Sequence, residues 1–233
     1  QKHIPHAMPA GLRGIKIREK STSGVYPLIQ NESGLVSLVQ MNAVELHGWQ
    51  SRARDLERPD QVIFDLDPGE GVKWSEVADT AFAIRGILQR CGLMPFLKTS
   101  GGKGLHLVVP LKPAATWNEV KGFAEAVSLG IAHAAPDRYA DKMTKSIRGG
   151  RIYIDFHRNG RGATCVLPYS TRSRPGAPVS LPIPWEAVRK THSASEFTIE
   201  NVPSRIRRSR DPWKDFDKTR RPITRNTLAS VGI

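Results

Sequence analysis

Apolar and polar residues alternate along the chain in a way that predicts short strands interspersed with amphipathic helices. Apolar side chains recur at helical spacing after Asn31, Ser75 and Thr116, so a helix is expected after each. Ser75 is expected to cap the second helix, while Thr116 and Glu119 form a capping box for the third. Further strands are expected at residues 15–17, 44–47, 93–97, 105–109 and 151–157.

The segment after residue 150 predicts a β-hairpin. Residues 151–157 alternate strongly, Asn159-Gly160 is a typical hairpin turn, and residues 163–167 form the expected partner strand. Asp155 then lies in the first arm, on the face opposite its apolar neighbours. A carboxylate among buried strand residues is costly unless it is paired or binds a cation. Asp155 is therefore either a metal ligand or the partner of a neighbouring arginine.

One buried strand ends in two aspartates. Residues 62–68 read Val-Ile-Phe-Asp-Leu-Asp-Pro, so Asp65 and Asp67 share one face, near the end that Pro68 imposes. At an effective dielectric of about 20, two carboxylates about 4 Å apart repel by roughly 4 kcal/mol, so a cation is expected between them. Hard oxygen ligands suit Mg²⁺ or Mn²⁺. The alternative is a strand-end turn with two solvated aspartates.

A glycine-rich turn, Ser100-Gly101-Gly102-Lys103-Gly104, precedes the strand that contains His106. Glycines let backbone N–H groups converge on an anion, and Lys103 adds a positive charge. The turn is not a Walker A loop, because the spacing differs and Leu105 follows where Ser or Thr is needed. The alternatives are a tight turn with an exposed lysine and a buried, hydrogen-bonded histidine. The position of His106 favours contact with a triphosphate or sugar.

Charge and composition narrow the class of partner. The chain has 233 residues, enough for one large domain or two lobes, and a formal net charge of +13, which favours nucleic acid. Neither a long apolar run nor a basic amphipathic helix is present, so a membrane role is disfavoured. Cys91 and Cys165 form no CxxC pair, which argues against a zinc knuckle and fits a reducing compartment.

Basic residues are dense in the region that follows the third helix. Arginine suits a bidentate grip on phosphate, although charge runs are also typical of solvated faces. Arg172 and Arg174 follow the predicted hairpin and are expected to return toward Asp155. The whole set comprises Lys142, Lys145, Arg148, Arg151, Arg158, Arg161, Arg172 and Arg174.

Asp65, Asp67 and Asp155 together can hold two divalent ions for phosphoryl transfer, one at the attacking 3′-hydroxyl and one at the triphosphate. Two other functions use related features. A two-metal nuclease or phosphoesterase also needs clustered carboxylates, but it has no triphosphate to hold in the glycine turn. A non-catalytic DNA end-binding module explains the charge alone.

Three motifs follow in a fixed order at residues 64–68, 99–106 and 153–156. They resemble the D-x-D, S-x-H-like and hydrophobic-Asp motifs of the archaeo-eukaryotic primase superfamily. The closer resemblance, over essentially the whole chain, is to the polymerase domain of bacterial DNA ligase D, an end-joining enzyme. Three further segments are similar to that family, residues 1–3, 38–41 and 166–172.

The resemblance implies an α+β fold, with an αβ lobe and an RRM-like lobe, mixed β-sheets flanked by helices, and an active site between the lobes. It implies one catalytic domain over residues 1–233, whose family counterpart starts upstream of Gln1 with a part that helps bind a downstream 5′-phosphate. A zinc motif like that of replicative primases is missing from the sequence, which weakens a role in de novo priming. The implied location is the bacterial cytoplasm, at the nucleoid.

The resemblance also implies the site. Asp65, Asp67 and Asp155 would bind two Mn²⁺ or Mg²⁺ ions, and His47 would lie near the nucleotide sugar. The activity would be primer extension with ribo- or deoxyribonucleoside triphosphates, filling short gaps with or without a template. The partners would be DNA ends, the end-binding protein Ku, and ligase and phosphoesterase domains of the same polypeptide. The residues that would hold the nucleotide phosphates are Ser100, Lys103, His106, Arg172 and Arg174.

Overall fold

The computed structural model describes residues 3, 8–19, 21–144 and 149–232. Two residues of the basic set, Lys145 and Arg148, and most of the segment 1–3 lie outside the described residues. The chain forms two compact units, residues 1–46 and 47–233, which we describe one at a time.

The first unit is a β-hairpin with a short helix. Strands β1 (Leu12–Arg18) and β2 (Ser23–Ile29) pair antiparallel, and helix α1 (Glu32–Gln40) contacts both. The side chain of Asn31 caps α1 by accepting a hydrogen bond from the backbone N–H of Gly34. The predicted helix and the predicted strand at residues 15–17 are thereby confirmed.

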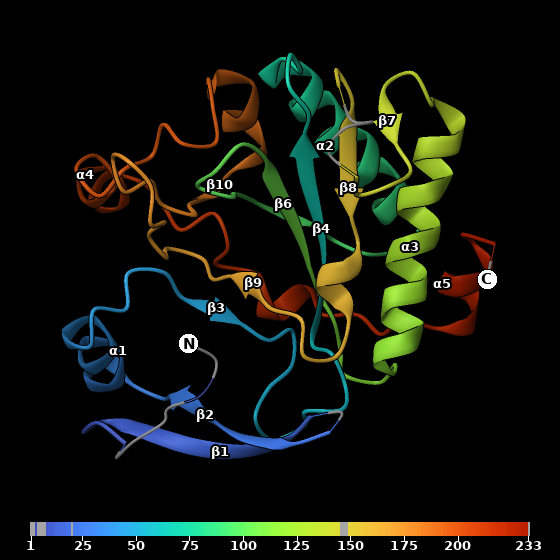
Figure 1. The fold of residues 1–233 in the computed structure, drawn as a ribbon. Helices are drawn as coiled ribbons and strands as arrows, with labels where there is room; N and C mark the ends of the chain where they lie inside the picture. The colour runs from blue at the N-terminus through green and yellow to red at the C-terminus, as the bar shows by residue number, and fades with distance from the viewer. Residues whose placement is uncertain (1–2, 4–7, 20, 145–148, 233) are drawn as a thin grey trace. The chain divides into compact units, whose positions relative to one another are not determined.

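The second unit is built on a six-stranded mixed sheet of order β10-β5-β6-β4-β8-β7 (Figure 1). Every neighbouring pair is antiparallel except β7 and β8. The strands are β4 (Gln61–Pro68), β5 (Phe96–Thr99), β6 (Leu105–Pro110), β7 (Tyr139–Ala140), β8 (Ile152–Asp155) and β10 (Pro182–Ile183).

One face of this sheet is covered by helices α2 (Trp74–Arg90) and α3 (Trp117–Ala134). The alternate residues Val62, Phe64 and Leu66 of β4 point into this interface and are fully buried. Each such side chain contributes about 1.5–3 kcal/mol when it leaves water. The helix faces follow the predicted spacing. The predicted capping box at the start of α3 is confirmed, but α2 starts after Lys73 rather than at a Ser75 cap.

Two predicted strand assignments are wrong. Residues 44–46 are not a strand; β3 is only His47–Gly48, and it pairs with β9 (Cys165–Val166). The predicted hairpin does not form either, because β8 pairs with β4 and β7 while β9 pairs with β3.

The physical reason is Asn159, which is fully buried in a 3₁₀ helix, η2 (His157–Asn159), instead of lying in an exposed turn. Its amide accepts a hydrogen bond from the backbone N–H of Ile63 at 2.8 Å and donates to the carbonyls of Ile63 and Phe156 at 2.7 and 3.0 Å. These three hydrogen bonds stabilise the buried, inward-facing position of Asn159 relative to an exposed position in a hairpin turn.

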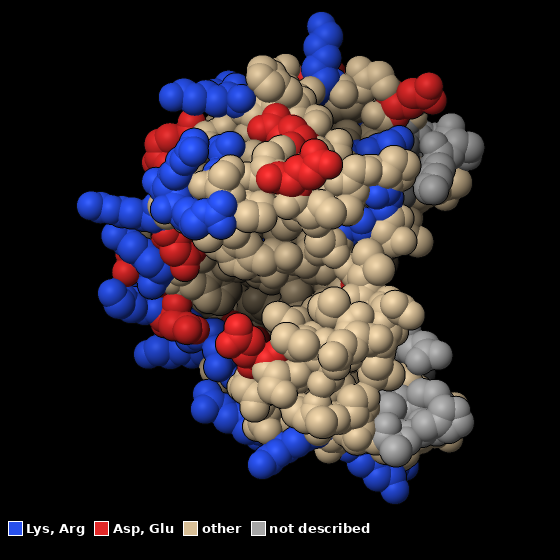
Figure 2. Space-filling view, turned by 90° about the vertical axis from the view of Figure 1, so that its left-hand side faces the viewer, with Lys and Arg blue, Asp and Glu red and all other residues tan. Residues whose placement is uncertain are grey.

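The C-terminal segment carries short elements: η3 (Trp185–Lys190), α4 (Val202–Arg208), η4 (Asp217–Thr219) and α5 (Arg225–Ala229). Arg205, Arg207, Arg208 and Arg210 are exposed at and just after α4, as predicted for a surface segment. Figure 2 shows many basic side chains on the surface of this side of the molecule. Among the described helices, each is too short or too polar to cross a membrane.

Candidate active site

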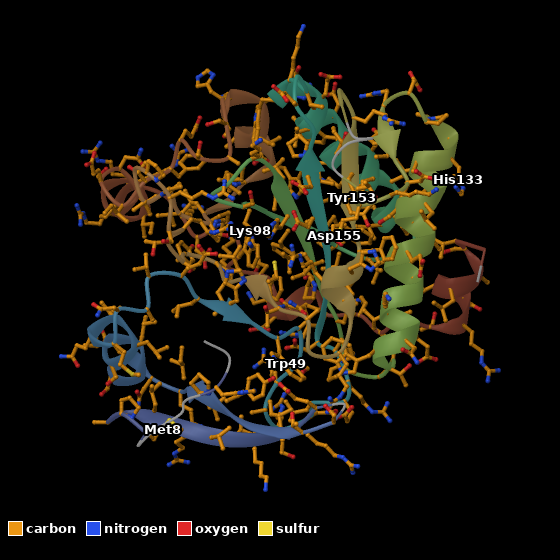
Figure 3. The ribbon with its side chains drawn as sticks, viewed as in Figure 1. Met8, Trp49, Lys98, His133, Tyr153 and Asp155 are labelled. Atoms are coloured by element: carbon orange, nitrogen blue, oxygen red, sulfur yellow. The ribbon has the colours of Figure 1, made fainter. Side chains whose placement is uncertain are left out.

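A row of polar side chains crosses the sheet on the face away from α2 and α3. Lys98 of β5 is directly opposite His106 of β6, His106 is opposite Asp65 of β4, and Asp65 is opposite Asp155 of β8. Directly opposed strand residues point to the same face, so the four side chains form one line across four strands. Figure 3 shows Lys98 and Asp155 at its two ends. We call Lys98, His106, Asp65 and Asp155 the polar row.

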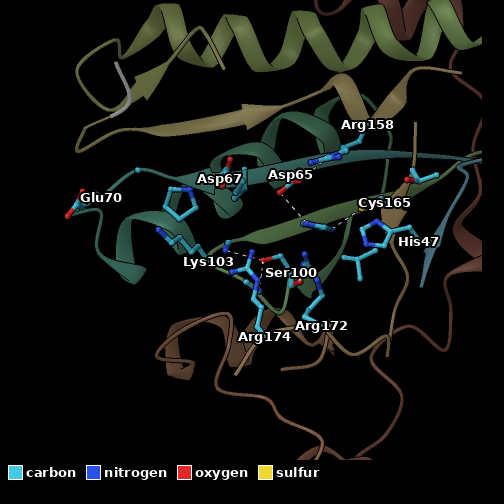
Figure 4. Close-up of a pocket in the computed structure, with 18 of the residues that line it drawn as sticks. His47, Asp65, Asp67, Glu70, Ser100, Lys103, Arg158, Cys165, Arg172 and Arg174 are labelled. Carbon is cyan, nitrogen blue, oxygen red and sulfur yellow. Dashed lines mark hydrogen bonds and ion pairs between the residues drawn. The ribbon is translucent and has the colours of Figure 1, made fainter. Parts of the chain in front are cut away.

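A cavity of about 720 Å³ opens over this face, within residues 47–233 (Figure 4). The carboxylates Asp65 and Asp67 lie on one wall, and the glycine turn with Lys103 and Arg174 lies on the opposite wall. Eight of the nine predicted site residues line it, namely His47, Asp65, Asp67, Ser100, Lys103, His106, Arg172 and Arg174. The chain segments that supply them are far apart in sequence. Asp155, the ninth, is not among the lining residues, but it lies directly opposite Asp65 on the neighbouring strand.

Asp155 shares Arg158 with Asp65 and is not among the residues that line the cavity. The Arg158 Nε is 3.4 Å from the Asp155 Oδ2 and 3.5 Å from the Asp65 Oδ2, so this guanidinium lies between the two opposed carboxylates. The arginine partner weighed for Asp155 from the sequence is therefore present. Asp155 also accepts a hydrogen bond from the backbone N–H of His157 at 2.8 Å.

The two opposed carboxylates have different proton affinities. Burial opposes ionisation of Asp65, but His106, Arg158 and Lys98 outweigh it and lower the pKa of its carboxyl to about 2. Burial, assisted by the negative charge of Asp65, raises the pKa of Asp155.

The donor set fits a hard divalent ion. The described residues contain no group of three His, Cys, Asp or Glu side chains already placed as metal ligands. Asp65 and Asp155 are nevertheless opposed across two strands, and Asp67 shares their face and lines the cavity. The Arg158 side chain is 46% exposed, so it can swing toward solvent and leave the carboxylates to an ion. Carboxylate oxygens are what Mg²⁺ and Mn²⁺ prefer.

The glycine turn is held by its own serine. The Ser100 Oγ accepts hydrogen bonds from the backbone N–H groups of Gly102 and Gly104, both at 3.1 Å. Arg172 donates to the Ser100 carbonyl at 2.5 Å. A Cβ on Gly104 would lie 1.7 Å from the Leu66 carbonyl oxygen, so only glycine lets the turn approach β4 beside the aspartates. Ser100 and Arg172 therefore shape the glycine turn, and the hydroxyl hydrogen of Ser100 can still donate into the cavity.

His106 is 3% exposed and both of its ring nitrogens have partners. Its Nε2 is 3.2 Å from the Asp65 Oδ1, and its Nδ1 is 2.8 Å from the Lys98 Nζ and 3.1 Å from the Cys165 Sγ. Burial alone would lower the pKa of the imidazole, but the Asp65 carboxylate outweighs it and raises that pKa. The geometry favours the hydrogen-bonded alternative for His106, and its contact with a triphosphate stays a prediction.

The sequence reasoning missed Lys98 and Cys165. Lys98 is buried against His106, and Cys165 lines the cavity beside the same ring. A signal for Lys98 existed, because a lysine in a short apolar strand directly before the glycine turn occupies a position that strands fill with buried residues. Cys165 carried no comparable signal, since its partner is remote in sequence.

Comparisons with known proteins agree on one family. The family described as LigD, primase-polymerase domain, matches residues 1–213. The multifunctional non-homologous end joining protein LigD of Pseudomonas aeruginosa is 37% identical over 236 residues, which cover 100% of this chain and 28% of that protein. The multifunctional non-homologous end joining DNA repair protein LigD of Mycobacterium tuberculosis (strain H37Rv) is 32% identical over 225 residues, 93% of this chain and 30% of that protein.

A solved structure also matches. The polymerase domain from Mycobacterium tuberculosis ligase D in complex with DNA has a TM-score of 0.86 and 30% identity, covering 94% of this chain and 78% of that one. The predicted α+β fold with mixed sheets flanked by helices is confirmed. The chain spans less than a third of the length of these two curated relatives, 28% and 30%. It belongs to the family of LigD primase-polymerase domains.

Proposed function

We propose that this domain is a metal-dependent nucleotidyltransferase that extends a primer at broken DNA ends during non-homologous end joining. The observation that carries the proposal is the cavity with carboxylates on one wall and a basic glycine turn on the other. A nucleoside triphosphate that shares a cation with the carboxylates fits this division of charge. A nuclease would have no triphosphate to place against the turn.

Each wall has a role in the reaction. Asp65, Asp67 and Asp155 would hold two Mn²⁺ or Mg²⁺ ions, which supply Lewis acidity at the 3′-hydroxyl and at the phosphates when bound. Lys103, Arg172 and Arg174 would bind the triphosphate, together with the Ser100 hydroxyl and His106. The remaining predicted nucleotide contact, His47 on β3, would lie at the sugar.

The proposed nucleotidyl transfer needs no general base from the protein. The primer 3′-oxygen forms a bond to the α-phosphorus, and the bond from that phosphorus to the oxygen bridging to the β-phosphate breaks. Pyrophosphate leaves with the electron pair, and the hydroxyl proton passes to water. The carboxylates hold the ions and need not transfer protons, which agrees with the low pKa of Asp65.

Membership of the same family also supports a proposal for the substrates and partners of the domain. We expect both ribo- and deoxyribonucleotides to be used, in templated gap filling and in non-templated addition. In a longer polypeptide the domain would work beside ligase and phosphoesterase domains and with Ku at DNA ends. The net charge of +13 supports DNA as the partner. If about 6–10 phosphate contacts form, affinity should fall by about 10³- to 10⁵-fold from 50 to 200 mM salt.

Primer extension in Mn²⁺ with either kind of nucleotide tests the proposal. Asp65→Ala and Asp155→Ala should abolish extension, whereas Asp79→Ala should not, because Asp79 pairs with Arg189 on the surface of α2. Undiminished extension by the first two variants would refute the metal assignment. Shortening of labelled DNA without nucleotide would indicate a nuclease. Salt-sensitive DNA binding without incorporation would indicate a non-catalytic end-binding module.

A further inference from the structure

The one member of the polar row without a role in the proposed reaction is Lys98. Its side chain is 1% exposed, on a strand, with its Nζ 2.8 Å from the His106 Nδ1 and 2.8 Å from the Ser180 Oγ. Burying an ammonium group is costly unless its hydrogen bonds are made. Because a methionine or leucine would fill the space at lower cost, the charge here needs an explanation beyond packing.

Ser180 fixes the direction of one of the two hydrogen bonds at Lys98. Ser180 uses its hydroxyl hydrogen on the Thr99 carbonyl at 2.9 Å, so the Ser180 Oγ accepts from Lys98. An ammonium group has three donors and no acceptor. Burial lowers the pKa of Lys98 to about 8. As an ammonium group, Lys98 donates both to Ser180 and to the His106 Nδ1.

A ring nitrogen that accepts from an ammonium group cannot carry a hydrogen of its own. In a ring that carries a single hydrogen, that hydrogen is then on Nε2, which faces the Asp65 Oδ1 at 3.2 Å. Asp65 accordingly has one oxygen held by the histidine. Its other oxygen, Oδ2, faces Arg158 and lies on the side of Asp155.

We propose that Lys98 is a positioning residue: by donating to the His106 Nδ1 it sets the orientation and tautomer of that ring, and so fixes which oxygen of Asp65 is presented to the catalytic ion. The inference rests on the proposed function in treating Asp65 as an ion ligand. Hydrogen-bond partners one step removed from a metal orient its ligands and affect metal affinity. Lys98 performs this task from two strands away, at the far end of the row.

Cys165 provides the competing arrangement. Its Sγ is 3.1 Å from the same Nδ1, so a ring protonated on Nδ1 would donate to a Cys165 thiolate. Burial raises the pKa of this thiol, but His106 and Lys98 outweigh burial and lower it. In that arrangement Lys98 no longer donates to the ring, and the histidine is oriented by the cysteine instead.

Nitrogen-15 NMR of the histidine side chains in the unmodified domain separates the two arrangements. We expect the signals of His106, assigned by loss in His106→Gln, to show hydrogen on Nε2 and an accepting Nδ1. Hydrogen on Nδ1, with or without hydrogen on Nε2, would overturn the proposal. This measurement does not depend on activity, on metal or on the folding of a substituted Lys98.

Measurements of metal binding and of kinetics then test whether Lys98 affects how Asp65 binds the ion. Lys98→Met removes the donor at similar volume, Lys98→Gln keeps a neutral donor, and Lys112→Met is an exposed control. Mn²⁺ affinity, measured by electron paramagnetic resonance, should fall by about 10- to 100-fold in Lys98→Met and less in Lys98→Gln. In primer extension kcat should fall while the nucleotide KM stays unchanged, because Lys98 is not among the residues that line the cavity.

The failure of this inference is distinguishable from failure of the proposed function. If the unmodified domain extends primers and folded Lys98→Met matches Lys112→Met in Mn²⁺ affinity and kcat, Lys98 is not a positioning residue. If the unmodified domain neither binds Mn²⁺ nor incorporates nucleotides, the proposed function fails, and with it this role. Should Lys98→Met fail to fold, Ser180→Ala, which removes the second anchor of the ammonium and the hydrogen bond to the Thr99 carbonyl, should show a smaller loss of Mn²⁺ affinity; no loss would count against the proposal.

Discussion

The two faces of the six-stranded sheet are built by different rules. The face under α2 and α3 is apolar, and its residues meet many neighbours with no specific partner. The opposite face carries the polar row, in which each group has a named partner at hydrogen-bond or ion-pair distance. The same strands supply both faces, because their side chains alternate.

This difference between the two faces predicts which property of the domain a substitution on each face should change. On the helix-covered face, volume and burial decide, so effects should appear in stability and be similar with or without metal. On the polar face, geometry and charge decide, so modest changes in stability should accompany large changes in metal binding or catalysis. Four substitutions test this contrast between the helix-covered face and the polar face, and their expected effects on stability range from about 5 to about 1 kcal/mol.

Phe123→Ala should have the largest effect on stability. Phe123 is fully buried and meets Phe64 edge to face, with ring centroids 6.5 Å apart, so truncation loses burial and leaves a cavity. We expect the free energy of unfolding to fall by about 3–5 kcal/mol in urea denaturation. Mn²⁺ affinity of the folded fraction should not change; a matching loss of affinity would show that the faces are coupled.

Gly104→Ala should damage both stability and function. The added Cβ would meet the Leu66 carbonyl and force the glycine turn away from β4, at an expected cost of about 1–3 kcal/mol in the free energy of unfolding. Nucleotide incorporation should be lost. Gly130→Ala on α3 is the control, because its Cβ would meet nothing within 4 Å, and it should stabilise by about 0.5–1 kcal/mol. Full activity of Gly104→Ala would contradict the close approach.

The sequence predicted the apolar face well for a physical reason. Burial against a helix requires only the right spacing, and spacing is visible in one chain. The apolar faces of α2 and α3, the shared face of Asp65 and Asp67, and the turn at 100–104 are all local patterns, and the structure has each of them.

The rest depends on partners that are remote in sequence. The predicted hairpin failed because Asn159 bonds to Ile63, 96 residues away. The role proposed for Lys98 follows only from the strand register that places it opposite His106, and the sequence alone does not give that register. The place of Arg158 between Asp65 and Asp155 likewise follows from the pairing of β4 with β8, which no local pattern reveals.

Asn159→Ala tests a buried polar side chain that stabilises the fold and does not belong to the polar row. Its loss leaves the Ile63 N–H and carbonyl buried without this partner, and we expect the free energy of unfolding to fall by about 1–3 kcal/mol. Asn201→Ala is the matched control, since Asn201 also bonds to backbone but is exposed, and it should cost less. Equal effects in chemical denaturation would show that burial of Asn159 is not decisive.

Arg158→Gln should change stability least and metal response most clearly. The guanidinium is half exposed, so its ion pairs should contribute only about 1 kcal/mol without metal. Because Arg158 occupies the space between Asp65 and Asp155, a bound ion must displace it in the unmodified domain but not in the variant. Mn²⁺ affinity should therefore rise in Arg158→Gln, and saturating Mn²⁺ should raise the melting temperature more than in the unmodified domain. A fall in Mn²⁺ affinity would mean that the arginine supports the ion rather than standing in for it, and that the opposed carboxylates share their charge between both cations.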